Sequence, residues 1–280
     1  MWPRRSNTGA WTGKTGAASK YLCPVIPHPA FEIINRHYDH IYVLSVAAAT
    51  ERRLRFDQRF AGLHYEYFYG ADKDRFTIPQ LETQQIFSEQ LARAQHRFGK
   101  TLRPGEIACS WSHRMIYEDI LQKGYRRALI LEDDAVPDPA ALEQLKAALN
   151  ELPTDAELVF WGWGKNGSRD WSGWCKQQLY HLQHALGLLK WNHRIIRNLY
   201  ARPFSQHLKK AGFHDFTYAY AVSSTAAAKL IQLQTPLQYI ADNLLAHAAT
   251  EEKVKAFTAW PKMFLHDEGS GGESNPSYIR

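Results

Sequence analysis

The chain has 280 residues, 45% of them hydrophobic, with a formal net charge of +6 and a pI near 9.1. This is the composition of a soluble globular protein that buries a full core, as one large or two modest domains, and its positive charge suggests an acidic partner. No run approaches the ~18 apolar residues of a spanning helix, and the N-terminus has no apolar secretion region, so we expect a cytoplasmic protein.

Residues 1–37 are interpreted as an N-terminal extension to a domain that spans 38–280. The first 20 residues contain no acid, are rich in Gly, Ser and Thr, and have no periodicity, so we expect disorder at least to residue 20. The stretch "GAWTGKT" at 9–15 imitates a phosphate-binding loop. It has three residues between its glycines instead of four and no preceding apolar strand, which argues against that function.

From residue 38 onward, apolar runs alternate with helical patterns. Continuous apolar runs predict strands at 40–46, 64–72, 127–134, 157–164 and 217–224. Helical spacing predicts helices at 49–60, 102–124 and 225–233, the second with Pro104 in its first turn and Gly124 at its end. Strands that alternate with helices predict an α/β fold: a doubly wound, mainly parallel sheet with helices on both faces.

Three consecutive acids, Glu132, Asp133 and Asp134, end the strand expected at 127–134. Such acids repel one another unless a cation lies among them, and ligands of open α/β sheets bind at the carboxyl ends of strands. Oxygen ligands favour Mn²⁺ or Mg²⁺, and alternation along the strand makes Glu132 and Asp134 the expected metal ligands. The alternative is that one acid caps the next helix and the others are solvated. The cysteines, at 23, 109 and 175, are scattered, which is typical of reduced structural thiols rather than a zinc cage.

The segment that follows is rich in aromatic and basic residues. "VFWGWGKNGSRDWSGW" places Trp among Gly, Asn and Ser, a composition suited to stacking on sugars; we expect Trp161 in the core and Trp163, Trp171 and Trp174 at an acceptor site. Residues 171–214 contain no acid and many Lys and Arg residues among apolar ones, which predicts a basic amphipathic insertion that contacts an anionic membrane surface. An ordinary solvated helix face remains the alternative.

The blocks "LRPGEIACSWSH", "LILEDDA" and "YAYAVSSTAAAKLI", with "IYVLSVAAATERR" before them, resemble glycosyltransferase family 25, the bacterial lipooligosaccharide galactosyltransferase family. The resemblance runs from about residue 38 to the C-terminus. It implies a GT-A-like fold, a UDP-sugar donor, usually UDP-galactose, a saccharide or glycolipid acceptor, and a divalent cation on the acidic motif. The chain departs from the family pattern at "YGADK" and at "YIADNLL".

Several site residues follow from this resemblance. GT-A-like enzymes often supply another metal ligand near the chain end, where this sequence has His266. Asp133 is expected to bind the nucleotide-sugar donor. An inverting transfer needs a general base, for which Asp242 is the first candidate and Asp215 the second. Asp242 could instead cap a helix.

The last group of candidates lies on two predicted helices. Arg52 and Arg53 could reach the diphosphate or only decorate a helix surface. Glu106 and His113 lie on one face of their helix, and the family's equivalent block borders the active site; packing against the sheet would explain them as well.

Two other functions stay open at this stage, and a third, nucleic-acid binding, is not expected. A phosphohydrolase would also place acids at a strand end, but "EDDAV" lacks the Asp-x-Asp-x-Thr order. A catalytically inactive glycan-binding or membrane-binding protein would keep the Trp-rich and basic segments without a metal. Nucleic-acid binding is disfavoured because the aromatic residues do not alternate with Lys and Arg on a recognisable sheet motif.

Overall fold

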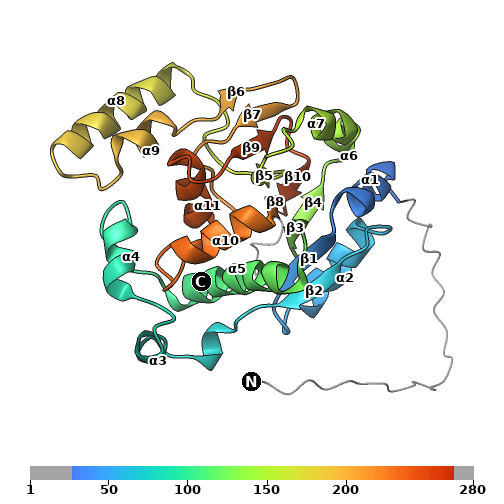
Figure 1. Cartoon of the computed structure of the whole chain (residues 1–280), viewed down its shortest axis with the longest axis horizontal. Helices are drawn as coiled ribbons and strands as arrows, with labels where there is room; N and C mark the ends of the chain where they lie inside the picture. The colour runs from blue at the N-terminus through green and yellow to red at the C-terminus, as the bar shows by residue number, and fades with distance from the viewer. Residues whose placement is uncertain (1–26, 268–280) are drawn as a thin grey trace.

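A computed structural model describes residues 27–267 (Figure 1). The expected disorder up to residue 20 and the loop-like stretch at 9–15 lie outside these residues. Part of the expected extension is folded: helix α1 (Pro29–His37) begins with a proline in its first turn and is capped by the His28 side chain. Its residues Ala30, Phe31 and Ile34 are buried, so the folded domain begins before residue 38.

The centre of the fold is an eight-stranded sheet. Its strands, in spatial order, are β2 (Glu66–Tyr69), β1 (His40–Ser45), β3 (Arg127–Glu132), β8 (Ala219–Ser223), β5 (Leu158–Phe160), β9 (Ala256–Ala259), β7 (Leu208–Lys210) and β6 (Arg202–Pro203). Strands β2, β1 and β3 are parallel, as are β5 and β9, and β8 runs antiparallel between β3 and β5. The predicted α/β, GT-A-like fold is confirmed, with a mixed sheet in which most strands point the same way.

Helices cover both faces of this sheet (Figure 1). One face carries α5 (Pro104–Lys123), α10 (Ser224–Leu233) and α11 (Ala241–Thr250). The other carries α1, α2 (Thr50–Arg59), α6 (Pro139–Leu142) and α7 (Leu145–Glu151). Strand β1 is buried from both sides because Ile41 and Val43 face one helical layer while Tyr42 and Leu44 face the other. Trp161 lies in the core, as expected.

The long α5 matches its sequence signals closely. Pro104 occupies its first turn, and Gly124 ends it with φ at 72°, a left-handed conformation that glycine adopts without strain. Between α2 and α5 lie β2, the short 3-10 helix η1 (Lys73–Arg75), α3 (Ile78–Thr83) and α4 (Glu89–Gln95).

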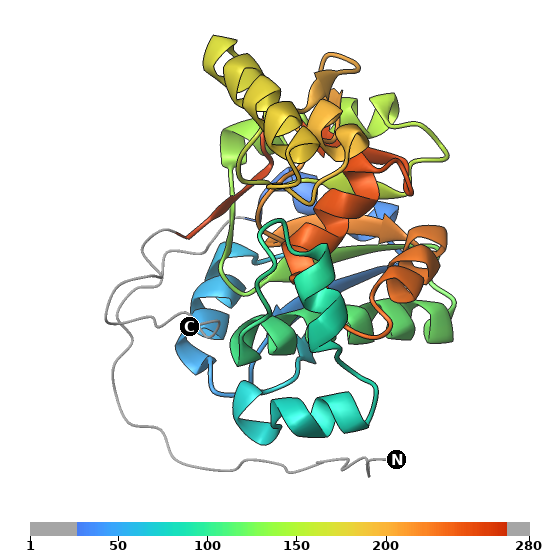
Figure 2. The same cartoon turned by 90° about the vertical axis from the view of Figure 1, so that its left-hand side faces the viewer.

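The expected basic segment at 171–214 is not one continuous helix. It forms α8 (Trp171–Ala185), α9 (His193–Arg197) and the antiparallel pair β6–β7, and Gly187, with a φ of 71°, lies in the turn where α8 ends. Helix α8 lies at the edge of the molecule (Figures 1 and 2). A separate two-stranded sheet joins β4 (Ala135–Pro137) to β10 (Phe264–His266). Within residues 27–267, no helix combines the length and apolar character needed to cross a bilayer.

Candidate functional site

A pocket of about 200 Å³ lies where β1, β2 and β3 end. Because these strands are parallel, their carboxyl ends meet at one edge of the sheet, where ligands of open α/β sheets bind. The loop after β1, the segment after β2, the first half of α5 and the acids after β3 form its walls, and the lining side chains include Ser45, Arg52, Asp72, Cys109, Glu132, Asp133 and Asp134. The acidic motif therefore faces a pocket, as the sequence predicted from the strand end.

Arg52 holds two of the three acids. Its Nη2 atom forms an ion pair with Asp133 and lies 2.8 Å from Asp134 Oδ2. Ser45 Oγ, at the end of β1, donates to Asp133 Oδ2 at 2.6 Å. Burial raises the pKa of Asp133 to about 6, even though Arg52 and the Ser45 hydrogen bond act in the opposite direction. Two of the three carboxylates thus share one arginine at this edge of the sheet.

Asp134 and His266 lie together, although they are far apart in the sequence. Strand β10 pairs with β4, which brings His266 opposite Ala135 and its Nε2 atom within 3.5 Å of Asp134 Oδ2. Burial raises the pKa of Asp134, but His266 and the charge of Arg52 outweigh it and hold the pKa below its ordinary value. Asp134 Oδ1 is buried and has no hydrogen-bond partner among the described residues. This unpartnered oxygen, beside an imidazole, is a donor set that fits a divalent cation such as Mn²⁺.

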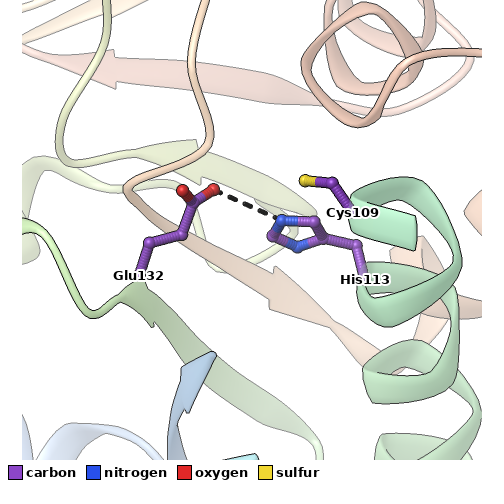
Figure 3. Close-up of side chains that lie close together, drawn as sticks. All are labelled: Cys109, His113 and Glu132. Carbon is purple, nitrogen blue, oxygen red and sulfur yellow. Dashed lines mark ion pairs between the residues drawn. The ribbon is translucent and has the colours of Figure 1, made fainter. Parts of the chain in front are cut away.

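Glu132 points toward α5 (Figure 3). Its Oε1 atom lies 3.4 Å from His113 Nε2 and accepts a hydrogen bond from Thr217. Cys109 and His113 are one helical turn apart, so both side chains face Glu132, and the ligand atoms of the three residues all lie within 4.8 Å of one another. Burial raises the pKa of the Cys109 thiol well above its ordinary value, and the charge of Glu132 raises it further. Because metals bind the thiolate, this cluster is better suited to holding Glu132 in place.

A buried chain of hydrogen bonds fixes His113 from behind. His113 Nδ1 lies 2.7 Å from the Tyr220 hydroxyl, and that hydroxyl lies 2.9 Å from the hydroxyl of Tyr117. All three side chains are buried. The chain connects α5 with β8 and orients the His113 ring toward Glu132, an orientation role that imidazoles commonly receive from their second nitrogen.

We expect Tyr220→Phe to lower the free energy of unfolding by about 1–3 kcal/mol, because it leaves His113 Nδ1 and the Tyr117 hydroxyl without their shared partner in the core. Chemical denaturation of the variant beside wild type measures this difference. Tyr69→Phe, at a half-exposed position on β2, is the matched control and should unfold like wild type. Equal stability of the two variants would show that the chain contributes nothing to folding.

The turn Asp215–Thr217 connects the remaining acids to the site. Phe216 has a φ of 73°, a left-handed conformation that costs a bulky residue of order 1–3 kcal/mol and often occurs at functional sites. Its N–H donates to Asp242 Oδ2 at 3.2 Å. Asp215, beside it, forms an ion pair with Lys165 at 2.8 Å. The Thr217 hydroxyl donates to Glu132. This one strained turn therefore contains a candidate acid, Asp215, and makes hydrogen bonds to two others, Asp242 and Glu132.

Asp242 lies in the first turn of α11 but does not cap it. The capping position is Ile240, and the Asp242 Oδ1 atom accepts from the backbone N–H of its neighbour Asn243 at 2.7 Å. Burial, helped by the nearby charge of Asp215, raises the pKa of Asp242 to about 6. Among the described residues, no cationic side chain forms an ion pair with Asp242. A carboxylate with a raised pKa and no cationic partner is a stronger proton acceptor than Asp215, which pairs with Lys165.

A second pocket, of about 420 Å³, lies beside Asp215 and the start of α11. Lys165 and Asp215 line it together with Asn243 of α11. Side chains from the loop after α4, from α8 and from the segment before α11 complete its walls, including Arg97, Lys176, Tyr180, Gln238 and Tyr239. This larger, polar pocket thus reaches one candidate base, Asp215, and Asn243, the direct neighbour of the other.

The three tryptophans expected at an acceptor site do not gather around either pocket. Trp163 is buried, and its Nε1 atom donates to the Ala259 carbonyl at 3.0 Å, so its ring packs in the core and is not available to a sugar. Trp171 and Trp174 are exposed and stack on each other at 5.0 Å between ring centroids, on the outer side of α8. The composition of the loop does not indicate which of its tryptophans are buried, which is why Trp163 was wrongly expected at the acceptor site.

Two other expected donor-site residues make local contacts. Glu106 accepts from the backbone N–H of Arg103 at 2.8 Å and forms an ion pair with its side chain, which completes a capping box at the start of α5. Arg53 donates to the Val46 carbonyl at 2.6 Å and so supports the loop after β1 that lines the acid-lined pocket. Glu106 therefore has a structural role, and Arg53 shapes the pocket from behind.

Sequence reasoning missed Ser45, Thr217 and Lys165, each of which contacts a site acid. Ser45 ends β1, and Thr217 precedes β8, so both stand at strand ends next to the acidic motif. The sequence did contain a signal for Ser45 and Thr217, because each lies at an end of a predicted strand. Lys165 gave no such signal, because its contact with Asp215 joins residues of separate loops.

Comparison with known proteins identifies the family of the chain. A family model described as glycosyltransferase family 25 (LPS biosynthesis protein) matches residues 38–245. A glycosyltransferase 25 family member of Drosophila pseudoobscura pseudoobscura is 28% identical over 189 residues, 61% of this chain and 30% of that protein. A second, from Aedes aegypti, is 24% identical over 224 residues, 78% of this chain and 31% of that protein.

A human relative carries the name inactive glycosyltransferase 25 family member 3. It is 27% identical over 128 residues, which are 44% of this chain and 21% of that protein. The chain thus spans less than a third of the length of each of these three relatives.

Proposed function

The chain belongs to glycosyltransferase family 25, and we propose that it transfers a hexose, most simply galactose, from a UDP-sugar to a saccharide acceptor of lipooligosaccharide, lipopolysaccharide or a related surface glycan. The observation that carries this proposal is the acid-lined pocket at the ends of β1, β2 and β3, with Asp134 Oδ1 buried and unpartnered. That arrangement suits a nucleotide-sugar diphosphate bound through a divalent cation.

In this proposal Asp134 and His266 hold the cation, Mn²⁺ or Mg²⁺, and Glu132 completes the acidic surface beside it. When bound, the cation stabilises the negative charge that grows on the leaving diphosphate. Arg52 contributes a fixed positive charge at the same edge and prevents Asp133 and Asp134 from repelling each other. Ser45 and the loop after β1 keep Asp133 in place.

The chemical step in this proposal is an inverting transfer. The acceptor hydroxyl attacks the anomeric carbon, the bond to the diphosphate oxygen breaks, and Asp242 takes the hydroxyl proton. Asp242 suits this role because burial raises its pKa to about 6, which leaves it ionised at neutral pH and yet basic enough to accept a proton. The larger pocket beside Asp215 would then receive the acceptor.

Binding of UDP should depend on metal through Asp134. We expect isothermal titration calorimetry to show tighter UDP binding with Mn²⁺ than with a chelator, and we expect Asp134→Ala to lose that gain by about tenfold or more. Asp74→Ala, which removes an exposed acid beside the same pocket, is the control and should keep the gain. Equal affinity of wild-type protein in Mn²⁺ and in chelator would refute metal-dependent donor binding.

The names of some relatives favour a second candidate function. Proteins of rat, cattle and human in this family are named inactive or probable inactive. A catalytically inactive member would bind a glycan or a nucleotide sugar without turnover. Incubation with UDP-sugars, Mn²⁺ and a saccharide acceptor, followed by measurement of released UDP, separates the two functions.

A further inference from the structure

Helix α8 and the turn after it present large apolar side chains to solvent. The exposed fractions are 76% for Trp171, 57% for Leu182, 64% for Leu186 and 67% for Leu188, and Trp174 and Leu179 are exposed as well. Positions 171, 174, 179, 182 and 186 follow helical spacing, so they share one side of the helix. We name these six residues the apolar face of α8. Soluble monomeric proteins rarely expose such a contiguous apolar surface without a partner.

Contacts on the opposite side fix this orientation. The buried Gln177 side chain donates to the backbone carbonyls of Ile196 and Arg197, at 2.5 and 3.0 Å. Gly173 is buried against Tyr200, where a Cβ atom would lie 2.8 Å from the ring. The helix therefore packs on the domain through glutamine and glycine and cannot turn its apolar side inward without losing these contacts.

The segment that carries the apolar face is positively charged. No Asp or Glu occurs from Trp171 to His214. Lys176, Lys190, Arg194 and Arg197 are exposed, and within residues 27–267 none of them forms an ion pair with an acidic side chain. Lys190 and Arg194 instead donate to backbone carbonyls, of Arg93 and Glu251 respectively. Their charges are uncompensated at the surface.

We propose that the apolar face of α8 inserts into the interface of an anionic lipid bilayer, with exposed cations of the same segment, Lys190, Arg194 and Arg197, attracted to the lipid headgroups. An apolar face beside lysine and arginine, with Trp residues at one end, is the arrangement of helices that lie in the membrane interface. A second copy of the chain is a poorer partner. A twofold dimer through α8 would bring the same unpaired cations of both copies together, which is repulsive.

This orientation also relates the membrane to the site. Lys176 and Tyr180 lie on α8 and line the larger pocket, together with Asp215 and Asn243. In this proposal the outer side of α8 lies on the bilayer, while Lys176 and Tyr180 of the same helix line the pocket that contains Asp215. A lipid-linked saccharide could enter that pocket directly from the membrane surface. This last step rests on the proposed transferase function, whereas docking on the bilayer does not.

The test is sedimentation of the full chain with lipid vesicles. We expect binding to vesicles of phosphatidylcholine and phosphatidylglycerol, weaker binding at high salt, and little binding to phosphatidylcholine alone. The double substitution Leu182→Gln with Leu186→Gln should lower the ratio of bound to free protein by about tenfold or more, because it removes two inserted leucines. Leu54→Gln is the control, since Leu54 on α2 has the same exposed fraction as Leu182, 57%.

Several outcomes would overturn the proposal. Equal binding to neutral and anionic vesicles, or a double variant that binds like wild type, contradicts it. A dimer that wild type forms on gel filtration and the double variant loses, in the absence of vesicle binding, assigns the face to a second copy instead. Transfer to a soluble saccharide should be unchanged in the double variant. Loss of the proposed function and loss of membrane docking are therefore distinguished by separate measurements.

Discussion

Asp242→Asn is expected to lower turnover by about 10²-fold or more while UDP binding persists, the scale of an absent general base. Asn preserves the shape of the side chain but cannot take the acceptor proton. Both carboxylate oxygens accept backbone N–H groups, from Phe216 and Asn243, so the amide nitrogen of Asn would face a donor. We therefore also expect a loss of about 1–3 kcal/mol in the free energy of unfolding. Initial rates, calorimetry with UDP and chemical denaturation measure the three effects.

Two further variants make this result decisive. Asp215→Asn removes the other candidate base, and Asp170→Asn changes the residue that caps α8 through Gly173, where Asn is nearly as good a cap as Asp. Near-normal turnover of Asp242→Asn with collapse of Asp215→Asn would transfer the role to Asp215. Normal turnover of both would place the base elsewhere or indicate a retaining reaction.

The rate should also depend on pH in a defined direction. Burial raises the pKa of Asp242 from 3.8 to about 6, so the ionised base is lost as the pH falls through about 6, and turnover should fall with it. Stability changes in the opposite sense. A carboxyl group with a raised pKa in the folded state favours folding at low pH, and this contribution disappears as the pH rises from 3.8 to about 6. Asp242→Asn should remove that part of the pH dependence of unfolding.

The main strands could be predicted from sequence because they are buried on both faces. Runs such as "HIYVLSV" and "RALILEDD" are continuous and apolar, and they became β1 and β3. The direction of β8 could not be predicted, since a buried strand has the same pattern whether it runs parallel or antiparallel. Strands β4, β6, β7, β9 and β10 have two to four residues, too few for periodicity to identify them.

The acids of the candidate site could be predicted from the sequence, but most of the residues that contact them could not. Glu132 to Asp134 were identifiable because three acids follow a buried strand. Their contacts with Ser45, Arg52 and His266 join residues far apart in sequence, and only the fold brings them together. Arg52 was expected to reach a diphosphate or the solvent, and it contacts the acids themselves.

Arg52→Met tests how far the acidic cluster depends on that arginine. The Arg52 side chain is largely buried, and its Nη2 atom contacts both Asp133 and Asp134. Methionine keeps much of the side-chain volume but removes the guanidinium that two adjacent buried carboxylates share. Removal of one partner from a buried ion pair typically costs about 3–5 kcal/mol, and we expect a destabilisation of that size at pH 7. Thermal and chemical denaturation of the variant measure it.

The same variant links stability to the proposed metal. Without Arg52, the two carboxyl groups should take up protons more readily, so the destabilisation should shrink as the pH falls from about 7 to about 5. A divalent cation that binds at Asp134 replaces the lost charge, and Mn²⁺ should therefore raise the melting temperature of Arg52→Met more than that of wild type. Arg55→Met, on the same helix and without an ion pair among the described residues, is the control. If Arg52→Met unfolds like Arg55→Met and Mn²⁺ stabilises neither, the acids do not form a charge cluster that a cation can occupy.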